Sequence, residues 1–391
     1  MNFKLKYSHI RGGKVMKKLI IHLDVSAIDI EQFIRAVSFI SEDIIECKKN
    51  NQDIEFLISD AAEQEELKNK IIEFLKKFIS VRQDECIYLF TNNDKKYYMD
   101  IQDNIISFDD GLIGMSEETL LLFRYFDSCF REMAINLGAQ EKIYPVLLPT
   151  HAYRKTGYPK NSPQYSMFCC CPFENMDVLE SINERLDKQQ VGEILNEPMY
   201  VLSPSACFHT YLEYENSRLE NPSIFTFSQS VFRNEGRLNY SEVGRLKNYH
   251  VREIVFVGTN EYVINMRKKI MNSVIKIVEQ LKLEGDISIA SDPFIMPKLQ
   301  KHKKIQQLEK MKYEMHLNYE KGKKMSVASF NLHGTAFTKP FNISVKNVFT
   351  PITGCVGFGI ERWVIAFLCQ YGNNIDNWPD EIKNSGGFRN V

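Results

Sequence analysis

The segment from residue 198 to residue 345 constrains the fold most, because its extended segments do not alternate regularly with helices. Strands are predicted at PMYVLSP, SIFTFSQSVFRNEG, KNYHVREIVFVG, DISIASDPF, MSVASFNLH and FNISV. Helices are predicted only near residues 260–283 and 298–315. A parallel sheet needs a crossover helix between successive strands. The pattern therefore favours an α+β fold, in which helices flank a mainly antiparallel sheet.

The first hundred residues have a different pattern. Residues 1–15 are basic and predict a flexible tail, and KKLIIHLDV begins the first strand. Helices are predicted over residues 30–49 and 61–79, with strands at 53–59, 86–90 and 97–102. This βαβαββ order predicts a small α/β domain of unknown role over residues 16–104. A larger catalytic domain, residues 105–391, then opens with a helix that Ser116 caps and Gly138 ends.

Composition and charge restrict the functional classes. The 391 residues include 49 Lys and Arg against 50 Asp and Glu, so no global field draws the chain to nucleic acid or anionic lipid. No apolar stretch reaches the ~18 residues of a membrane span, and the N-terminus lacks the pattern of a secretory leader. The nine cysteines, an odd number without framework spacing, indicate reduced thiols. We therefore expect a cytoplasmic protein with no membrane partner.

Two motifs carry residues suited to a phosphorylated ligand. In TGCVGFGIER, Gly357 and Gly359 let backbone N–H groups approach a ligand, and Arg362 presents a planar fork for phosphate. In FRNEG, alternation along a strand places Arg233 and Glu235 on one face. Each motif alone also fits a structural role: glycines at a strand-helix junction, or a salt-bridged exposed hairpin. A dinucleotide fingerprint is excluded, because Arg362 stands at its sixth position and no βαβ unit follows.

Together the motifs resemble those of the class II aminoacyl-tRNA synthetases. Phe-Arg-x-Glu on a hairpin is similar to motif 2, GFGIER to motif 3, and the helix with KIYPVLLP to a weak motif 1, usually a homodimer interface. A narrower resemblance, over residues 110–385, is to the amino acid:[carrier protein] ligases, relatives of the atypical zinc-dependent seryl-tRNA synthetases. It rests on LSPSACFHTY, FRNEG, VREIVFVGT, ASDPF, SFNLH and TGCVGFGIER in this order.

The resemblance implies roles for particular residues. A Zn²⁺ ion would be bound by Cys207, Glu253 and Cys355, although without the resemblance these cysteines fit small buried hydrophobic residues better than metal ligands. The remaining implied roles fall into three groups. ATP would be bound by Arg233, Glu235, Tyr249, Gly357, Gly359 and Arg362, the amino acid by Asn331, Cys207 and Glu253, and Arg233 and Arg362 would be catalytic.

No Mg²⁺ ligand and no catalytic histidine is assigned. Related enzymes have a metal-binding glutamate six residues before Asn331, where this chain has Met325, so the way in which Mg²⁺ is held is left open. The nearby histidines receive no catalytic role, because the substrate carboxylate is itself the nucleophile. They are His209, His250 and His333.

The implied reaction is the ATP-dependent activation of glycine, alanine or serine, followed by transfer to the phosphopantetheine thiol of a carrier protein. We expect tRNA to be an unlikely partner, because residues 1–104 hold 16 basic against 18 acidic side chains. Lysines in the basic helix near 298–315 would dock an acidic carrier protein or form a solvated face; they are Lys298, Lys301, Lys303, Lys304, Lys310 and Lys312. Two alternatives stay open: an atypical seryl-type tRNA synthetase, and an inactive paralogue that binds an amino acid or adenylate.

Overall fold

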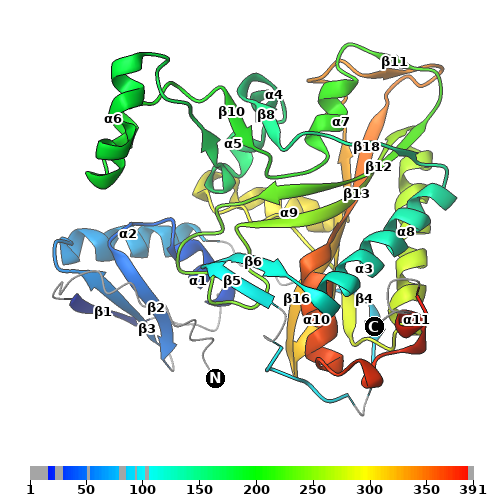
Figure 1. Cartoon of the computed structure of the whole chain (residues 1–391), viewed down its shortest axis with the longest axis horizontal. Coiled ribbons are helices and arrows are strands. Elements are labelled where there is room, and N and C mark those ends of the chain that lie inside the picture. The colour runs from blue at the N-terminus through cyan, green and yellow to red at the C-terminus, as the bar shows by residue number, and fades with distance from the viewer. Residues whose placement is uncertain are drawn as a thin grey trace.

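The computed structural model describes residues 16–22, 30–50, 53–78, 85–92, 95–101 and 105–385. Its centre is an eight-stranded sheet, in which β7 and β12 pair in parallel and the other neighbours are antiparallel (Figure 1). The predicted α+β fold with an antiparallel sheet is confirmed. In order across the sheet, the strands are β4 Cys86–Phe90, β14 Gly285–Ile289, β15 Lys312–Glu320, β16 Lys323–Gly334, β18 Ile352–Gly359, β13 Asn248–Gly258, β12 Ser223–Phe232 and β7 Gln140–Glu141.

Three long helices cover one face of this sheet: α3 Glu117–Asn136, α8 Asn260–Gln280 and α10 Ile360–Tyr371. As predicted, α3 begins after Ser116, whose backbone N–H donates to Thr119 Oγ1, and ends before Gly138 at a φ of 88°. Phe130 of α3 stacks on Phe358 of β18, with ring centroids 4.1 Å apart, and also contacts Trp363. This aromatic layer fixes α3 and α10 against the sheet.

The opposite face carries a second apolar cluster, built from shorter elements. These are the three-stranded sheet β8 Leu147–Pro149, β10 Tyr200–Leu202 and β9 Phe168–Cys169, with α4 Thr150–Lys155 and α7 Phe208–Glu213. The remaining elements are β5 Ile105–Asp109, β6 Leu112–Met115, α5 Tyr158–Asn161, α6 Met176–Asp187, β11 Arg218–Leu219, α9 Gln300–Leu308, β17 Ser344–Val345 and α11 Asp380–Lys383. The candidate site lies between this second cluster and the sheet.

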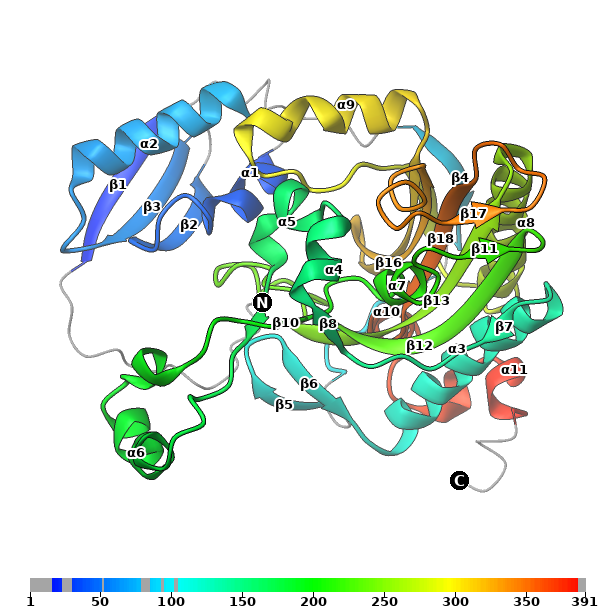
Figure 2. The same cartoon turned by 90° about the horizontal axis from the view of Figure 1, so that it is seen from above.

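The elements of the N-terminal unit form a group apart from the large sheet in Figure 2. This unit has an apolar core of its own. It consists of β1 Met16–His22, α1 Ile30–Val37, β2 Ile44–Asn50, β3 Asp53–Ser59 and α2 Gln64–Lys77. Its antiparallel sheet has the order β1-β3-β2. The predicted helix over residues 30–49 is wrong in its second half, because Asp43 accepts a hydrogen bond from Ser59 Oγ and the chain turns there into β2.

Two other expectations need correction. The predicted domain of residues 16–104 includes β4, but β4 pairs with β14 at the edge of the large sheet, and residues 97–101 form no strand. The predicted basic helix ends early, since α9 stops at Leu308 and Lys312 begins β15. The predicted tail of residues 1–15 lies outside the described residues. None of the helices in the described part of the chain has both the length and the apolar character needed to cross a membrane.

We expect Phe130→Ala to lower the free energy of unfolding by about 3–5 kcal/mol, because the fully buried ring leaves a cavity beneath the sheet. Phe349, whose side chain is fully exposed, provides the matched control, and Phe349→Ala is expected to change stability by less than about 0.5 kcal/mol. Denaturant unfolding of the full chain measures both. Equal stability losses in the two variants would contradict this packing.

Candidate active site

Three segments that are distant in sequence meet at the predicted metal site. Cys207 directly precedes α7, Glu253 lies on β13 and Cys355 lies on the neighbouring β18. The sulfur and carboxylate ligand atoms all lie within 4.8 Å of one another, and the three residues are buried. Among the described residues, this is the one group of His, Cys, Asp or Glu side chains with such spacing. Burial alone would also fit two cysteines that act as small hydrophobic residues. Both sulfurs, however, lie close to the Glu253 carboxylate, which favours a metal site.

The register of β13 and β18 explains how this site forms. Val255 lies opposite Cys355 and Glu253 lies opposite Gly357. A Cβ atom added at Gly357 would lie 2.8 Å from Glu253 Oε2. Gly357 therefore provides the space that the Glu253 carboxylate occupies. Gly359 is different, because a Cβ there would make ordinary contacts, at 3.5 Å or more, with Tyr249 and Arg362.

The electrostatics of these three groups suit a divalent cation. Burial raises the pKa of Glu253 to about 7, and the pKa of Cys355 also rises well above its usual value, first because of its hydrogen bond with Cys207 and then because of burial. Each group becomes anionic when it loses its proton. A bound cation would stabilise all three in their charged forms, and two sulfurs with one carboxylate form a ligand set that zinc accepts.

Neighbouring polar side chains surround Cys355. Asn331 Nδ2 lies 3.5 Å from Cys355 Sγ and donates to Ser329 Oγ at 3.1 Å. His333 Nε2 lies 3.6 Å from the same sulfur, and burial lowers the pKa of His333 to about 4, so its ring is neutral at pH 7. Asn331 was predicted near the amino acid, whereas His333 received no role. The sequence offered one signal for a role of His333: it lies two residues after Asn331 on β16, where side chains share a face of the strand.

Two arginines and a tyrosine form the neighbouring part of the site. The guanidinium carbons of Arg233 and Arg362 lie 5.9 Å and 4.8 Å from the centre of the Tyr249 ring. Arg233 Nε donates to the backbone oxygen of Pro204, and Arg362 Nε donates to that of Gly244. The three predicted ATP-binding residues are therefore brought together. Two cations beside one aromatic ring suit a ligand with phosphates and a planar base.

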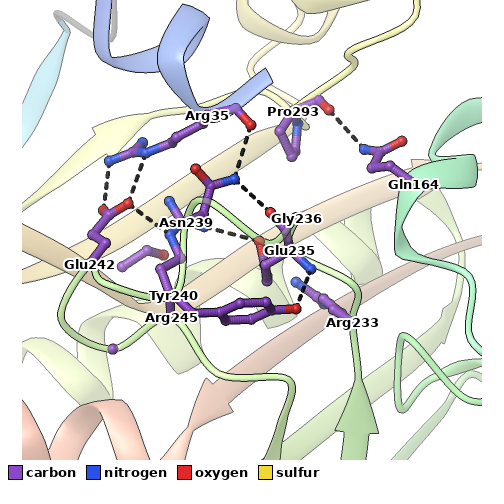
Figure 3. Close-up of polar contacts among 12 residues, drawn as sticks. Arg35, Gln164, Arg233, Glu235, Gly236, Asn239, Tyr240, Glu242, Arg245 and Pro293 are labelled. Carbon is purple, nitrogen blue, oxygen red and sulfur yellow. Dashed lines mark hydrogen bonds and ion pairs between the residues drawn. The ribbon is translucent and has the colours of Figure 1, made fainter. Parts of the chain in front are cut away.

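Glu235 is placed differently from the expectation. Strand β12 ends at Phe232, so the alternation that was to put Arg233 and Glu235 on one face does not extend to Glu235. The Glu235 carboxylate is buried and pairs with Arg245 at 3.2 Å, while its backbone N–H donates to the Tyr240 hydroxyl (Figure 3). Sequence reasoning missed Arg245, because only the folded loop brings it back to Glu235.

Arg252 has a structural position on the other side of β13. Its guanidinium forms two hydrogen bonds with Asp127 of α3, at 2.9 Å and 2.7 Å. Arg252 and its neighbour Glu253 therefore face opposite sides of β13, as side chains that follow one another along a strand do. Met325, at the position of the expected metal-binding glutamate, has its sulfur beside Gly244. Position 325 therefore offers no carboxylate for Mg²⁺.

Comparisons with known proteins support the fold. No protein-family model matches the chain. The type-2 serine–tRNA ligase of Methanococcus maripaludis strain C5 is 32% identical over 282 residues, covering 68% of this chain and 54% of the relative. That of Methanocaldococcus jannaschii is 32% identical over 279 residues, covering 67% and 53%. The chain thus spans about half the length of the curated relatives that it matches.

Comparison with solved structures indicates the same fold. The seryl-tRNA synthetase of M. kandleri, solved in complex with A. aeolicus tRNASec, superposes with a TM-score of 0.69 at 19% identity, covering 94% of this chain and 76% of that one. The enzyme from Pyrococcus horikoshii, complexed with ATP, gives 0.56 at 13% identity, covering 82% and 77%. This chain has a class II aminoacyl-tRNA synthetase-like fold.

The expected partners of this synthetase-like chain are contradicted. The relatives are serine–tRNA ligases and one was solved with tRNA, against the prediction that tRNA is unlikely and that a carrier protein is the partner. The net charge of residues 1–104 was a poor guide, because tRNA affinity depends on where basic groups gather, which a segment total does not report. Two of the six lysines do not belong to the expected face, since Lys303 is buried and Lys312 pairs with Asp292 and Glu314. The other four are exposed: Lys298, Lys301, Lys304 and Lys310. The homodimer stays a prediction.

We expect Gly357→Ala to weaken zinc binding by the metal-free protein by about tenfold or more, because the new methyl group displaces the Glu253 carboxylate. Gly359→Ala, on the same strand, is the control and is expected to bind zinc as the unaltered chain does. Competition with a chromophoric chelator measures both affinities. Full zinc affinity in Gly357→Ala would contradict the assigned ligand role of Glu253.

Proposed function

We propose that this chain activates serine with ATP and transfers the seryl group to tRNA, in the manner of its type-2 serine–tRNA ligase relatives. The observation that carries the proposal is the meeting of Cys207, Glu253 and Cys355 on the sheet face, in a fold shared with seryl-tRNA synthetases. Arg233, Tyr249 and Arg362 supply the arrangement that ATP requires.

The two parts of the site have different tasks. Zinc held by Cys207, Glu253 and Cys355 would supply a Lewis-acid position for the substrate amino group. Asn331, whose amide lies at Cys355, would orient the amino acid. Because both groups fix the substrate, its carboxylate can be held in line with the α-phosphorus of ATP.

The first step forms the adenylate. A carboxylate oxygen of serine attacks the α-phosphorus, the bond to the bridging oxygen of pyrophosphate breaks, and pyrophosphate leaves with its electron pair. Arg233 and Arg362 stabilise the negative charge that spreads over the phosphate oxygens, and Mg²⁺ accompanies ATP. Tyr249 would stack on the adenine ring. Arginine suits this role because its planar fork forms two hydrogen bonds with a phosphate at once.

The second step transfers the acyl group. A ribose hydroxyl at the 3′ end of tRNA attacks the acyl carbon, its proton is released, and AMP leaves. The neutral His333 ring and the Asn331 amide line the neighbourhood of Cys355 without charge. Neither side chain therefore adds a second cation beside the position where zinc would hold the substrate amine.

Serine-dependent exchange of pyrophosphate into ATP tests the activation step. We expect Arg233→Ala and Arg362→Ala each to lower the exchange rate by about 100-fold or more, because each removes a charged donor from the transition state. Arg185 lies on α6 and forms an exposed ion pair with Glu193. Arg185→Ala breaks this pair and should leave the exchange rate unchanged. No exchange by the unaltered chain with any amino acid would support the inactive paralogue instead.

Charging of total tRNA with radiolabelled serine tests the transfer step. We expect seryl-tRNA to form with the unaltered chain, and expect Cys207→Ser to abolish both bound zinc and charging, because a hydroxyl is a poor zinc ligand. Cys369→Ser provides the control, since Cys369 is buried in α10, in the helix-side core. Active exchange without any tRNA charging would retain the activation step and reject tRNA as the acceptor.

A further inference from the structure

A chain of alternating charges links the small N-terminal domain to the ATP-site loop (Figure 3). Arg35, on α1 of the small domain, forms two hydrogen bonds with the Glu242 carboxylate, at 2.7 Å and 3.1 Å. Glu242 also receives Arg245 Nε at 3.1 Å, and Arg245 Nη1 lies 3.2 Å from Glu235 Oε2. The four residues form one continuous network, in which each interior group contacts two opposite charges.

Burial increases along this network toward the active site. The side chain of Arg35 is 36% exposed, that of Glu242 29%, that of Arg245 22% and that of Glu235 4%. Ion pairs between exposed side chains contribute little to stability, but buried charges depend strongly on their partners. The network therefore begins at the surface of the small domain. Glu235, its most buried member, depends most on its partner.

Hydrogen bonds between side chains and backbone groups also join the small domain to the loop around the network. Asn239 Nδ2 donates to the backbone oxygens of both Arg35 and Glu235, at 3.0 Å and 2.6 Å. Leu238 N–H donates to Ser38 Oγ at 3.2 Å. Gly236 has a φ of 89°, and a Cβ there would lie 2.7 Å from Ser38 Cβ. The loop thus fits closely against α1 and the turn that follows it.

The buried end of the network lies beside the ATP-binding arginine. Glu235 is two residues from Arg233, whose guanidinium carbon lies 5.7 Å from the centre of the Tyr165 ring. Burial raises the pKa of Tyr165, and the Glu235 carboxylate adds to that rise while Arg233 and Arg245 oppose it. Arg233, Glu235 and Arg245 are therefore all close enough to Tyr165 to act on its hydroxyl electrostatically. A movement of Glu235 would change the surroundings of Arg233.

We propose that Arg35 is a positioning residue for ATP, by which the small domain completes the nucleotide site through Glu242, Arg245 and Glu235. The small domain then has a defined task in the first reaction step: it holds the loop between β12 and β13 in the conformation that binds ATP. This inference rests on the proposed function, since it assigns ATP to the site of Arg233 and Arg362.

Equilibrium binding of ATP to the full chain, by titration calorimetry, tests this role directly. We expect Arg35→Ala and Glu242→Gln each to weaken ATP binding by about five- to tenfold, a loss of the size that one ordinary hydrogen bond contributes. The double variant should bind ATP with the same affinity as whichever single variant binds it less tightly, because both changes break the same network. Arg35→Lys keeps the charge and should recover part of the affinity.

Kinetics separate positioning from a general loss of structure. In serine-dependent exchange, Arg35→Ala should raise the KM for ATP and leave the KM for serine unchanged. Arg185→Ala, which breaks an exposed ion pair elsewhere, is the control and should change neither KM. Thermal unfolding of each variant checks that the small domain is still folded. If Arg35→Ala is unfolded, Arg35→Lys replaces it in the same measurements.

The outcomes distinguish this inference from the proposed function. ATP affinity within twofold of the unaltered chain in a folded Arg35→Ala variant would overturn the role of Arg35, whatever the amino acid substrate. Additive losses in the double variant would also overturn it, because the two residues would then act separately. Weakened ATP binding without serine-dependent exchange by the unaltered chain would support the positioning role and reject serine activation.

Discussion

The pairing register of β13 and β18 is the constraint on which the candidate site depends. It sets Glu253 opposite Gly357 and Cys355 opposite Val255, and so brings a carboxylate and a sulfur together on one face of the sheet. A slip of one residue would turn either side chain toward the helices, because successive residues face opposite sides. Cys207, directly before α7 in the second cluster, then completes the group. Three buried groups that can all become anionic are stable together as anions only with a compensating cation.

The same strand also connects the site to the stable part of the fold. Arg252 pairs with Asp127 of α3 on one side of β13, while Glu253 faces the site on the other. Phe130 of the same helix stacks on Phe358 of β18, three residues after Cys355. The helical layer therefore fixes both strands that carry ligands. Such support matters because metal-binding and catalytic side chains must stay close to one geometry.

Much of the larger domain could be predicted from the sequence, since alternating strands, the Ser116 cap and the hairpin between β12 and β13 are local patterns. The separations between Cys207, Glu253 and Cys355 carried no such signal, and only the resemblance to known ligases grouped them. The strand β4 was assigned to the wrong domain because its partner β14 lies about two hundred residues later. Lys312 was assigned to a basic helix, although it begins β15 and pairs with Asp292 and Glu314. Long-range pairing of this kind leaves little trace in local periodicity. The partner prediction failed for a related reason, because a charge total ignores spatial arrangement.

X-ray absorption at the zinc edge of the purified full chain tests the central claim most directly. The account predicts bound zinc with two sulfur neighbours at about 2.3 Å and lighter oxygen or nitrogen neighbours at about 2.0–2.2 Å. It also predicts the loss of bound zinc in Cys355→Ser, as in Cys207→Ser. A spectrum with only oxygen and nitrogen neighbours, or a protein that binds no zinc after reconstitution, would contradict the assignment of Cys207, Glu253 and Cys355 as a metal centre.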